Sequence, residues 1–387
     1  MWTKHHKFVS LSGLAFLILV FSGLAGAQEK YGYVDTNGKL SIAPEFVSAE
    51  PFSEGLAAIR TEKGGKWGYI DRTGTVIIPP QFVTADPFSE GLARVQTQAD
   101  GKYGYIDKTG RFAIPPRFER PYLTAGQFHN GLAQIREGDK VGIIDKTGEV
   151  VVPPQFANID LPFSEGLAAV RVDKKRGYID TTGKVVITPR FDQALRFSNG
   201  LAVISMGKQW GYIDRTGEVV IQAQFGCPHS FSEGLAETFS PDAHKWGYMD
   251  KTGTMVIPAL FTNARPFSEG LAQIQIERGG KYAYIDKTGR VVILPKFATA
   301  SRFADGLAAV QTEADGKWGY IDKTGTVVIP SRFAAADSFK DGLAAVQTET
   351  DGKWGYINRS GKLVTPPQFE EVRTFTDGMA VVAVATK

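Results

Sequence analysis

A motif that returns about every 36 residues dominates this chain and limits what it can fold into. One copy reads Trp-Gly-Tyr-Ile-Asp at residues 67–71, Val-Ile-Ile-Pro-Pro at 76–80 and Phe-Ser-Glu-Gly-Leu-Ala at 88–93. Tandem copies of this kind bury their apolar side chains against one another, so architecture and function must be sought in the repeat and in its departures. Ten copies are marked by the glycine of the first segment, at Gly32, Gly68, Gly104, Gly142, Gly177, Gly211, Gly247, Gly319 and Gly355, with Ala283 in the same position.

Each copy predicts three antiparallel strands. Residues 67–71 (the Trp-Gly strand) alternate in period two, and 76–80 (the proline strand) follow a turn of the Asp-Arg-Thr-Gly type. Aspartate can cap backbone amides in such a turn, and glycine supplies a positive φ. Residues 92–96 (the Leu-Ala strand) follow the next glycine. The sequence therefore predicts an all-β fold of ten three-stranded meanders in one domain, residues 28–387.

Spacing and phenylalanine content identify the core. The Trp position of each copy (the Trp slot) lies 15 residues before a Phe in all ten copies, from Tyr31–Phe46 to Trp354–Phe369. Of the 25 Phe residues, 20 occupy either this position, 15 residues after the Trp slot, or the position represented by Phe52. Such a regular aromatic pattern predicts packing rather than chemistry.

The order of strands bears on how the array ends. The first strand after residue 27 is a Trp-Gly strand, and the last, near Met379, is a Leu-Ala strand. A closed ring would pair these two strands, as in β-propellers, whereas an open array would leave an unpaired edge at each end. We expect one closed or nearly closed propeller-like ring, with an open β-solenoid or superhelix as the alternative.

Residues 1–27 have the features of a secretory signal peptide. Lys4 and Lys7 precede an apolar run at 11–24, and Ala25-Gly26-Ala27 is a small-residue cleavage site. The sequence thus predicts an exported protein, periplasmic or extracellular, with an uncleaved membrane anchor as the alternative. Without those two lysines, 42 of the 44 basic residues remain against 41 acidic ones, so we expect no affinity for nucleic acid or anionic membranes.

The Lys-Trp-Gly-Tyr-Ile-Asp segments at 66–71 and 317–322 resemble the WG-repeat (KWG-repeat) proteins of bacteria. The Pro-x-x-Phe and Phe-Ser-Glu-Gly-Leu-Ala segments also fit that family, and the resemblance covers nearly the whole chain after residue 27. The resemblance implies no shared catalytic residues. The Trp slot departs from the pattern at Val141 and Arg176, and the prolines are replaced by Gln222-Ala223.

Two parts of the sequence carry side chains that could bind a metal ion. The sixth copy carries Cys227, His229, Asp242 and His244, but their spacing matches no standard site, and the role of the single cysteine stays open. Each turn offers a single carboxylate, from its aspartate, and in most copies a Lys or Arg follows it. Ca²⁺ needs several oxygen ligands and would be repelled by the basic neighbour, so turn capping is favoured over Ca²⁺ binding. We therefore predict no metal and no cofactor.

Two repeated features could form surfaces. The Trp slot carries indole rings that could stack on sugars or instead belong to the core, at Trp67, Trp210, Trp246, Trp318 and Trp354. The turn lysines form a basic row, and an acidic row precedes the Leu-Ala glycine at Glu54, Glu90, Glu165, Glu233, Glu269, Asp305, Asp341 and Asp377.

The longest departure from the repeat lies at residues 120–125 and includes Arg120, Tyr122 and Leu123. Because binding residues tend to lie on loops held by a rigid frame, we predict that a partner binds the irregular copies three to six, residues 119–245. The chain is expected to be a non-catalytic interaction or scaffold module for an unknown protein. The alternatives are a cell-wall or polysaccharide binder that uses the Trp slot, and an enzyme.

Overall fold

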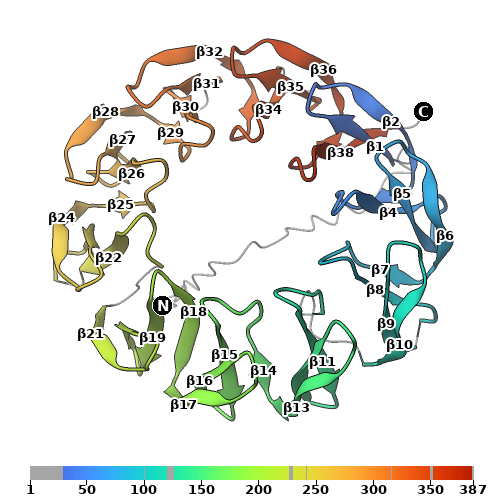
Figure 1. Cartoon of the computed structure of the whole chain (residues 1–387). Coiled ribbons are helices and arrows are strands. Elements are labelled where there is room, and N and C mark those ends of the chain that lie inside the picture. The colour runs from blue at the N-terminus through green and yellow to red at the C-terminus, as the bar shows by residue number, and fades with distance from the viewer. Residues whose placement is uncertain are drawn as a thin grey trace, which may run out of the picture.

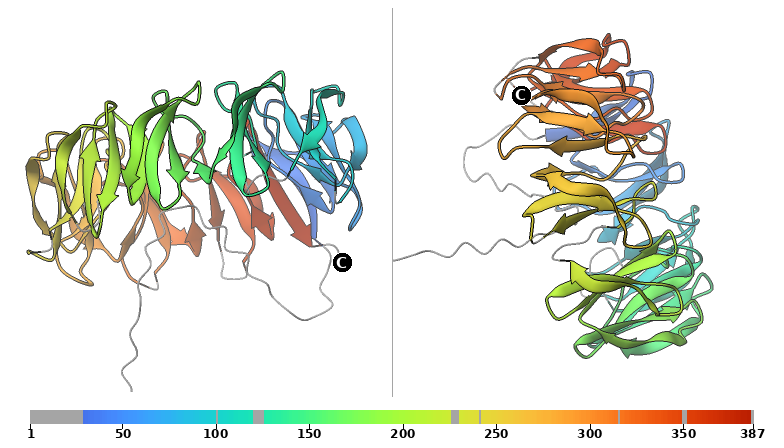
Figure 2. Two further views of the ribbon diagram at one scale, coloured as in Figure 1. Left: turned by 90° about the horizontal axis from the view of Figure 1, so that it is seen from below. Right: turned by 90° about the vertical axis from the view of Figure 1, so that its left-hand side faces the viewer.

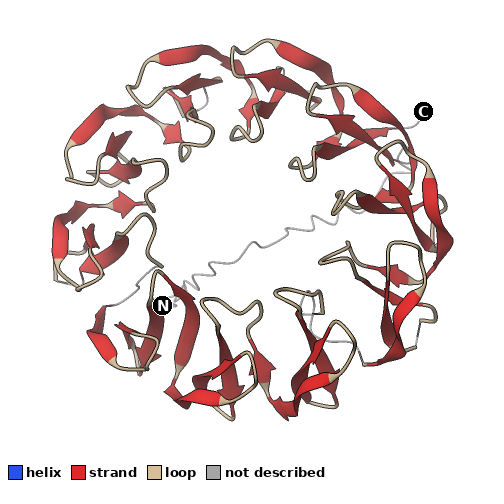
Figure 3. Cartoon of the chain, viewed as in Figure 1, coloured by secondary structure: helices blue, strands red, loops and turns tan. Residues whose placement is uncertain are grey.

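The protein is described by a computed structural model that covers residues 29–99, 101–119, 126–225, 230–240, 242–314, 316–348 and 352–385. Within these ranges the chain forms ten antiparallel sheets and no helix (Figure 3). The sheets stand side by side as blades in one layer around a ring (Figures 1 and 2). The predicted all-β ring of ten repeats is confirmed.

Nine blades follow one another along the chain. Their strands are β3 (Ser48–Ala49), β4 (Leu56–Arg60), β5 (Trp67–Asp71) and β6 (Val76–Phe82); β7 (Thr84–Ala85), β8 (Ala93–Gln96), β9 (Tyr103–Ile106) and β10 (Phe112–Phe118); β11 (Leu132–Glu137), β12 (Lys140–Asp145) and β13 (Val150–Phe156); β14 (Asn158–Ile159), β15 (Leu167–Val172), β16 (Lys175–Asp180) and β17 (Val185–Phe191); β18 (Gln193–Ser198), β19 (Leu201–Met206), β20 (Gln209–Ile213) and β21 (Val219–Phe225); β22 (Ala236–Ser240), β23 (Lys245–Met249) and β24 (Met255–Phe261); β25 (Asn263–Ala264), β26 (Ala272–Gln275), β27 (Tyr282–Ile285) and β28 (Val291–Phe297); β29 (Thr299–Ala300), β30 (Ala308–Gln311), β31 (Trp318–Ile321) and β32 (Val327–Phe333); and β33 (Ala335–Ala336), β34 (Leu343–Gln347), β35 (Trp354–Asn358) and β36 (Leu363–Phe369).

The tenth blade joins the two ends of the described chain. It consists of β37 (Glu371–Val372), β38 (Met379–Ala385), β1 (Glu29–Asp35) and β2 (Leu40–Phe46). Strand β38 pairs with β1 in continuous register from Met379↔Asp35 to Ala385↔Glu29. The ring is therefore closed by pairing between the first and last strands, as the split repeat predicts, and the open superhelix is not formed.

Most blades have one strand more than the sequence predicts. A short strand of usually two residues pairs with the Leu-Ala strand, as β3 pairs with β4. The sheets β11–β13 and β22–β24 have three described strands, and the positions equivalent to β3 fall outside the described residues in both. The proline strands lie on the outer side of the ring (Figure 1).

The core lies between neighbouring blades. One cluster joins Tyr69, Ile78 and Phe82 of the β3–β6 blade to Phe88 and Val95 of the next blade. The Tyr69 ring meets Phe88 edge-on at a centroid distance of 5.0 Å, and its hydroxyl donates to the Asp86 carbonyl oxygen at 2.7 Å. Each blade therefore completes the core of its neighbour.

The glycine of the Trp-Gly strand is required by the close approach of the proline strand. A Cβ atom on Gly68 would lie 2.6 Å from the Ile78 carbonyl oxygen and 2.7 Å from the Pro80 nitrogen. The pairing of β5 with β6 shifts register at this point, which brings the two backbones together.

Candidate functional site

The indole rings of the Trp slot lie on five different blades. All five are half-buried at the start or second position of their strands. Each packs against the apolar cluster of its own blade boundary. The Arg60 guanidinium lies 4.5 Å above the Trp67 ring, and Phe239 meets Trp246 edge-on at 5.4 Å. The structure therefore gives the rings a packing role and leaves part of each ring exposed.

Both departures in the Trp slot have local explanations. Val141 is fully buried in the cluster around Val152 and Val170. Arg176 instead forms an ion pair with Asp160 at 2.5 Å. The slot thus accepts an aliphatic core residue or a paired cation in place of an aromatic ring.

The predicted partner-binding residues Arg120, Tyr122 and Leu123 lie outside the described residues. A cavity of about 440 Å³ lies between the β7–β10 and β11–β13 blades, and its lining includes Glu119, the last described residue before this segment. It is lined by basic and acidic side chains in equal number, Lys102, Arg117, Arg136, Glu119, Glu137 and Glu149.

Hydrogen bonds to backbone atoms organise this cavity. Arg117 donates to the Gly148 carbonyl oxygen across the blade boundary. Glu119 accepts from the Gly138 nitrogen at 3.0 Å, and Arg136 donates to the Gly138 carbonyl oxygen at 2.5 Å. The charges on its wall are suited to a polar protein surface rather than to an apolar small molecule.

The metal candidates of the sixth copy do not form a described site. Cys227 and His229 lie outside the described residues, and the His244 ring stacks on Phe239 with 6.4 Å between centroids. Among the described residues, no three His, Cys, Asp or Glu side chains are grouped in a way that could hold a metal ion.

The aspartates of the turns cap backbone amides, as the sequence predicts. Oδ1 of Asp71 accepts from the Thr73 nitrogen at 2.8 Å, the Thr73 hydroxyl at 2.6 Å and the Thr75 nitrogen at 3.0 Å. The hydroxyl bond chiefly lowers the pKa of this carboxyl below its usual range. Asn358 makes the same contacts with Ser360 and Lys362.

The acidic and basic rows pair with each other across blade boundaries. Glu54 lies in a two-residue hairpin between Ser53 and Leu56, which we call the rim hairpin, with φ of 55° at Glu54 and 86° at Gly55. The Glu54 carboxylate accepts from the Gly91 nitrogen of the next blade at 2.9 Å and lies 3.2 Å from the Lys108 ammonium. The rows are therefore structural contacts rather than two free lines of charge.

The same contacts recur around the ring. The Ser53 hydroxyl donates to the Phe88 carbonyl oxygen of the next blade at 2.6 Å. Equivalent serine contacts are made by Ser89, Ser164, Ser232 and Ser268. Equivalent carboxylate contacts with the next glycine are made by Glu90, Glu165, Glu233, Glu269, Asp305 and Asp377.

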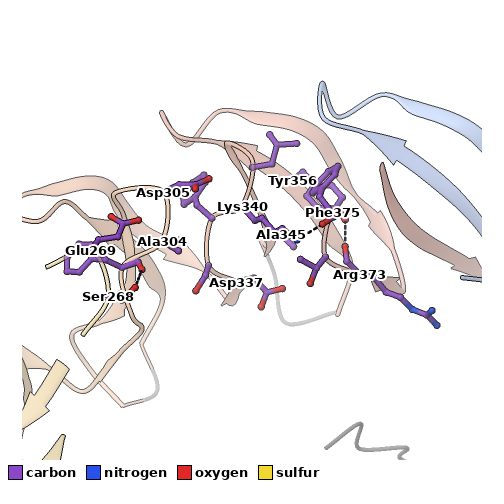
Figure 4. A pocket seen from close by; sticks show the side chains of 15 residues that line it. Ser268, Glu269, Ala304, Asp305, Asp337, Lys340, Ala345, Tyr356, Arg373 and Phe375 are labelled. Carbon is purple, nitrogen blue, oxygen red and sulfur yellow. Dashed lines mark hydrogen bonds between the residues drawn. The ribbon is translucent and has the colours of Figure 1, made fainter. Parts of the chain in front are cut away.

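A second cavity, of about 650 Å³, lies along three consecutive rim hairpins, at 268–271, 304–307 and 340–343, and reaches Arg373 and Phe375 (Figure 4). Ala304 occupies the serine position here and lacks the hydroxyl, whereas Lys340 donates to the Phe375 carbonyl oxygen at 2.6 Å. Burial raises the pKa of the Asp337 carboxyl on its wall. The described residues that line this cavity include neither His nor Cys, so they contain no Ser–His or Cys–His pair.

The family pattern described as a WG containing repeat matches ten consecutive segments of the chain, at residues 31–67, 67–103, 103–140, 142–175, 177–210, 210–237, 246–282, 282–317, 318–354 and 354–384. The chain belongs to the WG-repeat family. This WG-repeat protein was matched to no relative among curated proteins. No described helix of the WG-repeat ring is long and apolar enough to cross a membrane.

Solved structures similar to this WG-repeat protein include a eukaryotic initiation factor, at 11% identity and a TM-score of 0.45, with 87% of this chain and 95% of that chain covered. Hsv2p of Kluyveromyces lactis has 11% identity and a TM-score of 0.34, with coverage of 58% and 88%. A virginiamycin B lyase from Staphylococcus aureus has 10% identity and a TM-score of 0.24, with coverage of 92% and 100%. Likenesses this distant do not bear on function.

Sequence reasoning missed the contacts that cross blade boundaries. The tyrosine of the Trp-Gly strand carried a usable signal, because it recurs 17 residues before the residue whose carbonyl accepts its hydroxyl, as in Tyr69–Asp86 and Tyr320–Asp337. The serine and glutamate of the rim hairpin also recur about one repeat before their partners, although the exact separation varies between copies. Spacing alone does not show that two such positions meet.

Proposed function

We propose that this WG-repeat ring is an exported, non-catalytic interaction module whose partner is a protein that binds the irregular arc, residues 119–245. The fold itself is consistent with an interaction or scaffold role. The cavity beside Glu119 carries the proposal, because Glu119 immediately precedes the longest insertion in the sequence and the cavity presents both signs of charge. Charged walls are suited to recognition of a polar protein surface.

Departures from the repeat within this arc support the same location. The rim-hairpin carboxylate is replaced at Asn130 and Asn199. Gln134 and Glu237 are almost fully buried polar side chains at a position where six other blades carry alanine or valine and two carry Arg94 and Gln273. Functional residues are expected at positions that depart from the pattern that the rest of the fold follows.

The test compares three forms of the protein without residues 1–27. Deletion of Arg120–Thr124 should leave the thermal unfolding transition unchanged and remove binding to a partner captured from an envelope extract and then purified. Arg302→Ala, an exposed side chain outside the arc, should leave binding unchanged. Persistence of full affinity in the deletion variant would contradict the proposal. N-terminal sequencing of the exported protein checks for cleavage after Ala27.

A cell-wall or polysaccharide binder is the second candidate, and the half-exposed indole rings favour it. Trp318→Ala and Trp354→Ala should then reduce co-sedimentation with peptidoglycan or insoluble polysaccharide without any change in the 120–125 segment. Retention of the wild-type protein on none of these polymers would exclude this candidate.

A further inference from the structure

The outer edge of the β18–β21 blade differs from every other described outer edge. Strand β21 reads Val-Val-Ile-Gln-Ala-Gln-Phe, whereas each of the other nine outer strands has at least one proline at its fourth or fifth position. Those strands are β2, β6, β10, β13, β17, β24, β28, β32 and β36.

The prolines protect edges that would otherwise pair. An outer strand has a neighbour on one side only, so alternate residues direct N–H and C=O groups away from the blade. Proline removes an N–H donor, fixes its own φ and restricts the residue before it. Edge prolines are therefore a common device against strand pairing between molecules.

Strand β21 lacks this protection and is accessible. Among the described residues it pairs only with β20, and it is the last strand of its sheet (Figure 1). The side chains of Val220, Gln222 and Gln224 are exposed, with 43% of the Val220 surface accessible. The strand carries no charged residue that would repel another strand.

The blade behind this edge has the longest innermost strand among the described four-stranded blades. Its innermost strand, β18, has six residues, whereas the innermost strands of the other four-stranded blades have two. Pairing between β20 and β21 begins at Ile213↔Val219 and extends to Trp210↔Phe225. A partner strand would thus extend a well-formed four-stranded sheet.

We propose that two copies of this protein associate through β21, with the two strands antiparallel about a twofold axis. Nine of the ten outer edges within one copy carry proline, so the matching partner for the remaining free edge is the same edge of a second copy. A twofold contact uses both free edges at once and closes the assembly at a dimer. This inference is independent of the partner proposed above.

The blocking experiment places the Pro-Pro sequence of β6 into β21. Gln222→Pro with Ala223→Pro should convert a dimer into a monomer in analytical ultracentrifugation and raise the dimer dissociation constant by about tenfold or more. Gln224→Lys is a second blocking variant, because it adds a like charge to both strands of the contact. Lys296 already occupies the equivalent position of β28, so this change is compatible with the fold.

The converse experiment opens a second edge. Pro79→Gln with Pro80→Ala makes β6 read Val-Ile-Ile-Gln-Ala-Gln-Phe, nearly the sequence of β21. A protein with two free edges should form chains larger than a dimer, and the combination with the blocked β21 should restore a dimer. Hydrogen exchange of the β21 amides should also slow as protein concentration rises.

A wild-type protein that stays monomeric at millimolar concentration would overturn the proposal. So would a dimer that survives both blocking variants with unchanged affinity, because the contact would then lie elsewhere.

Discussion

Buried tyrosines connect neighbouring blades through single hydroxyl groups. Tyr320 donates to the Asp337 carbonyl oxygen at 2.7 Å, whereas Tyr356 reaches the Arg373 carbonyl oxygen only at 3.4 Å. The longer bond lies beside the cavity where Lys340 replaces a serine. Since bond strength falls steeply with distance, these two otherwise equivalent residues should differ in their contribution to stability.

Removal of the two hydroxyls tests this difference. Tyr320→Phe should lower the free energy of unfolding by about 1–3 kcal/mol, because a buried carbonyl oxygen loses its partner. Tyr356→Phe, the matched control, should cost distinctly less. Urea denaturation monitored by circular dichroism measures the free energy of unfolding of both variants. If both variants lose the same free energy of unfolding, the length of the hydroxyl bond does not determine the loss.

The aspartates of the turns make stability depend on pH. Hydrogen bonds, chiefly from the following threonine hydroxyl, lower the folded-state pKa of Asp71, Asp107, Asp145, Asp180, Asp214, Asp250, Asp286 and Asp322. A lowered pKa means that the charged form stabilises the fold. This stabilisation is complete above the unfolded pKa of about 3.9 and is lost as pH falls through the folded pKa.

The expected result is a urea midpoint that is steady near pH 7 and falls below about pH 4. Asp322→Asn provides the control, because Asn358 shows that an amide oxygen can cap the same turn. The difference in midpoint between wild type and this variant should shrink as pH falls. A difference that is constant from pH 7 to pH 3 would contradict the assignment.

At the scale of structural elements, the rim hairpin connects one blade to the next. Its two positive φ values suit a type I′ turn, a geometry in which Asn, Asp and Gly are preferred. Glutamate nevertheless fills the first position in five copies, Glu54, Glu90, Glu165, Glu233 and Glu269. The contact of its carboxylate with the next glycine nitrogen offsets the backbone cost.

Exchange of serine and alanine tests this element in both directions. Ser268→Ala removes the hydroxyl bond to the Phe303 carbonyl oxygen and should lower the free energy of unfolding by about 0.5–1.5 kcal/mol. Ala304→Ser adds the equivalent donor near Phe339 and should raise it by a similar amount. Urea denaturation of both variants beside the wild type checks this, and a destabilising Ala304→Ser would show that a serine at this position does not form the bond.

At the scale of the whole molecule, the ring closes through β-strand pairing rather than through a covalent link. Residues Glu29 and Ala385 are partners in the register of β1 and β38. The ends of the described chain therefore lie side by side, and closure depends on one strand pair.

Two changes to the chain test whether folding requires the pairing of β38 with β1: removal of β38, and a circular permutation that keeps all strands. Removal of residues 379–387 should abolish the single cooperative unfolding transition, because β1 and β37 lose their common partner. A circular permutant that links Ala385 to Glu29 and opens the loop at 61–66 should fold with a similar transition temperature. Calorimetry measures the unfolding transition of both proteins. If the truncated protein still unfolds in a single cooperative transition, the ring does not need its closing strand.

The sequence by itself determined the repeat, the strand order within it, the turn chemistry and the phenylalanine core. These properties follow from local periodicity and from side-chain types at fixed spacing. It also favoured closure over an open superhelix, since a ring pairs the two strands of a repeat that is divided between the two ends. It predicted capping by the turn aspartates because each turn has a single carboxylate next to a cation.

Only the tertiary structure decided how the blades meet. The pairing of Glu54 with Gly91 and Lys108 joins residues far apart in the chain, and its geometry depends on the angle between blades. Packing of two sheets sets that angle, so no local pattern contains it. The short fourth strand was missed for the same reason, because two residues such as Ser48–Ala49 become a strand only against a neighbour. The half-burial of the Trp slot likewise arises where two blades join.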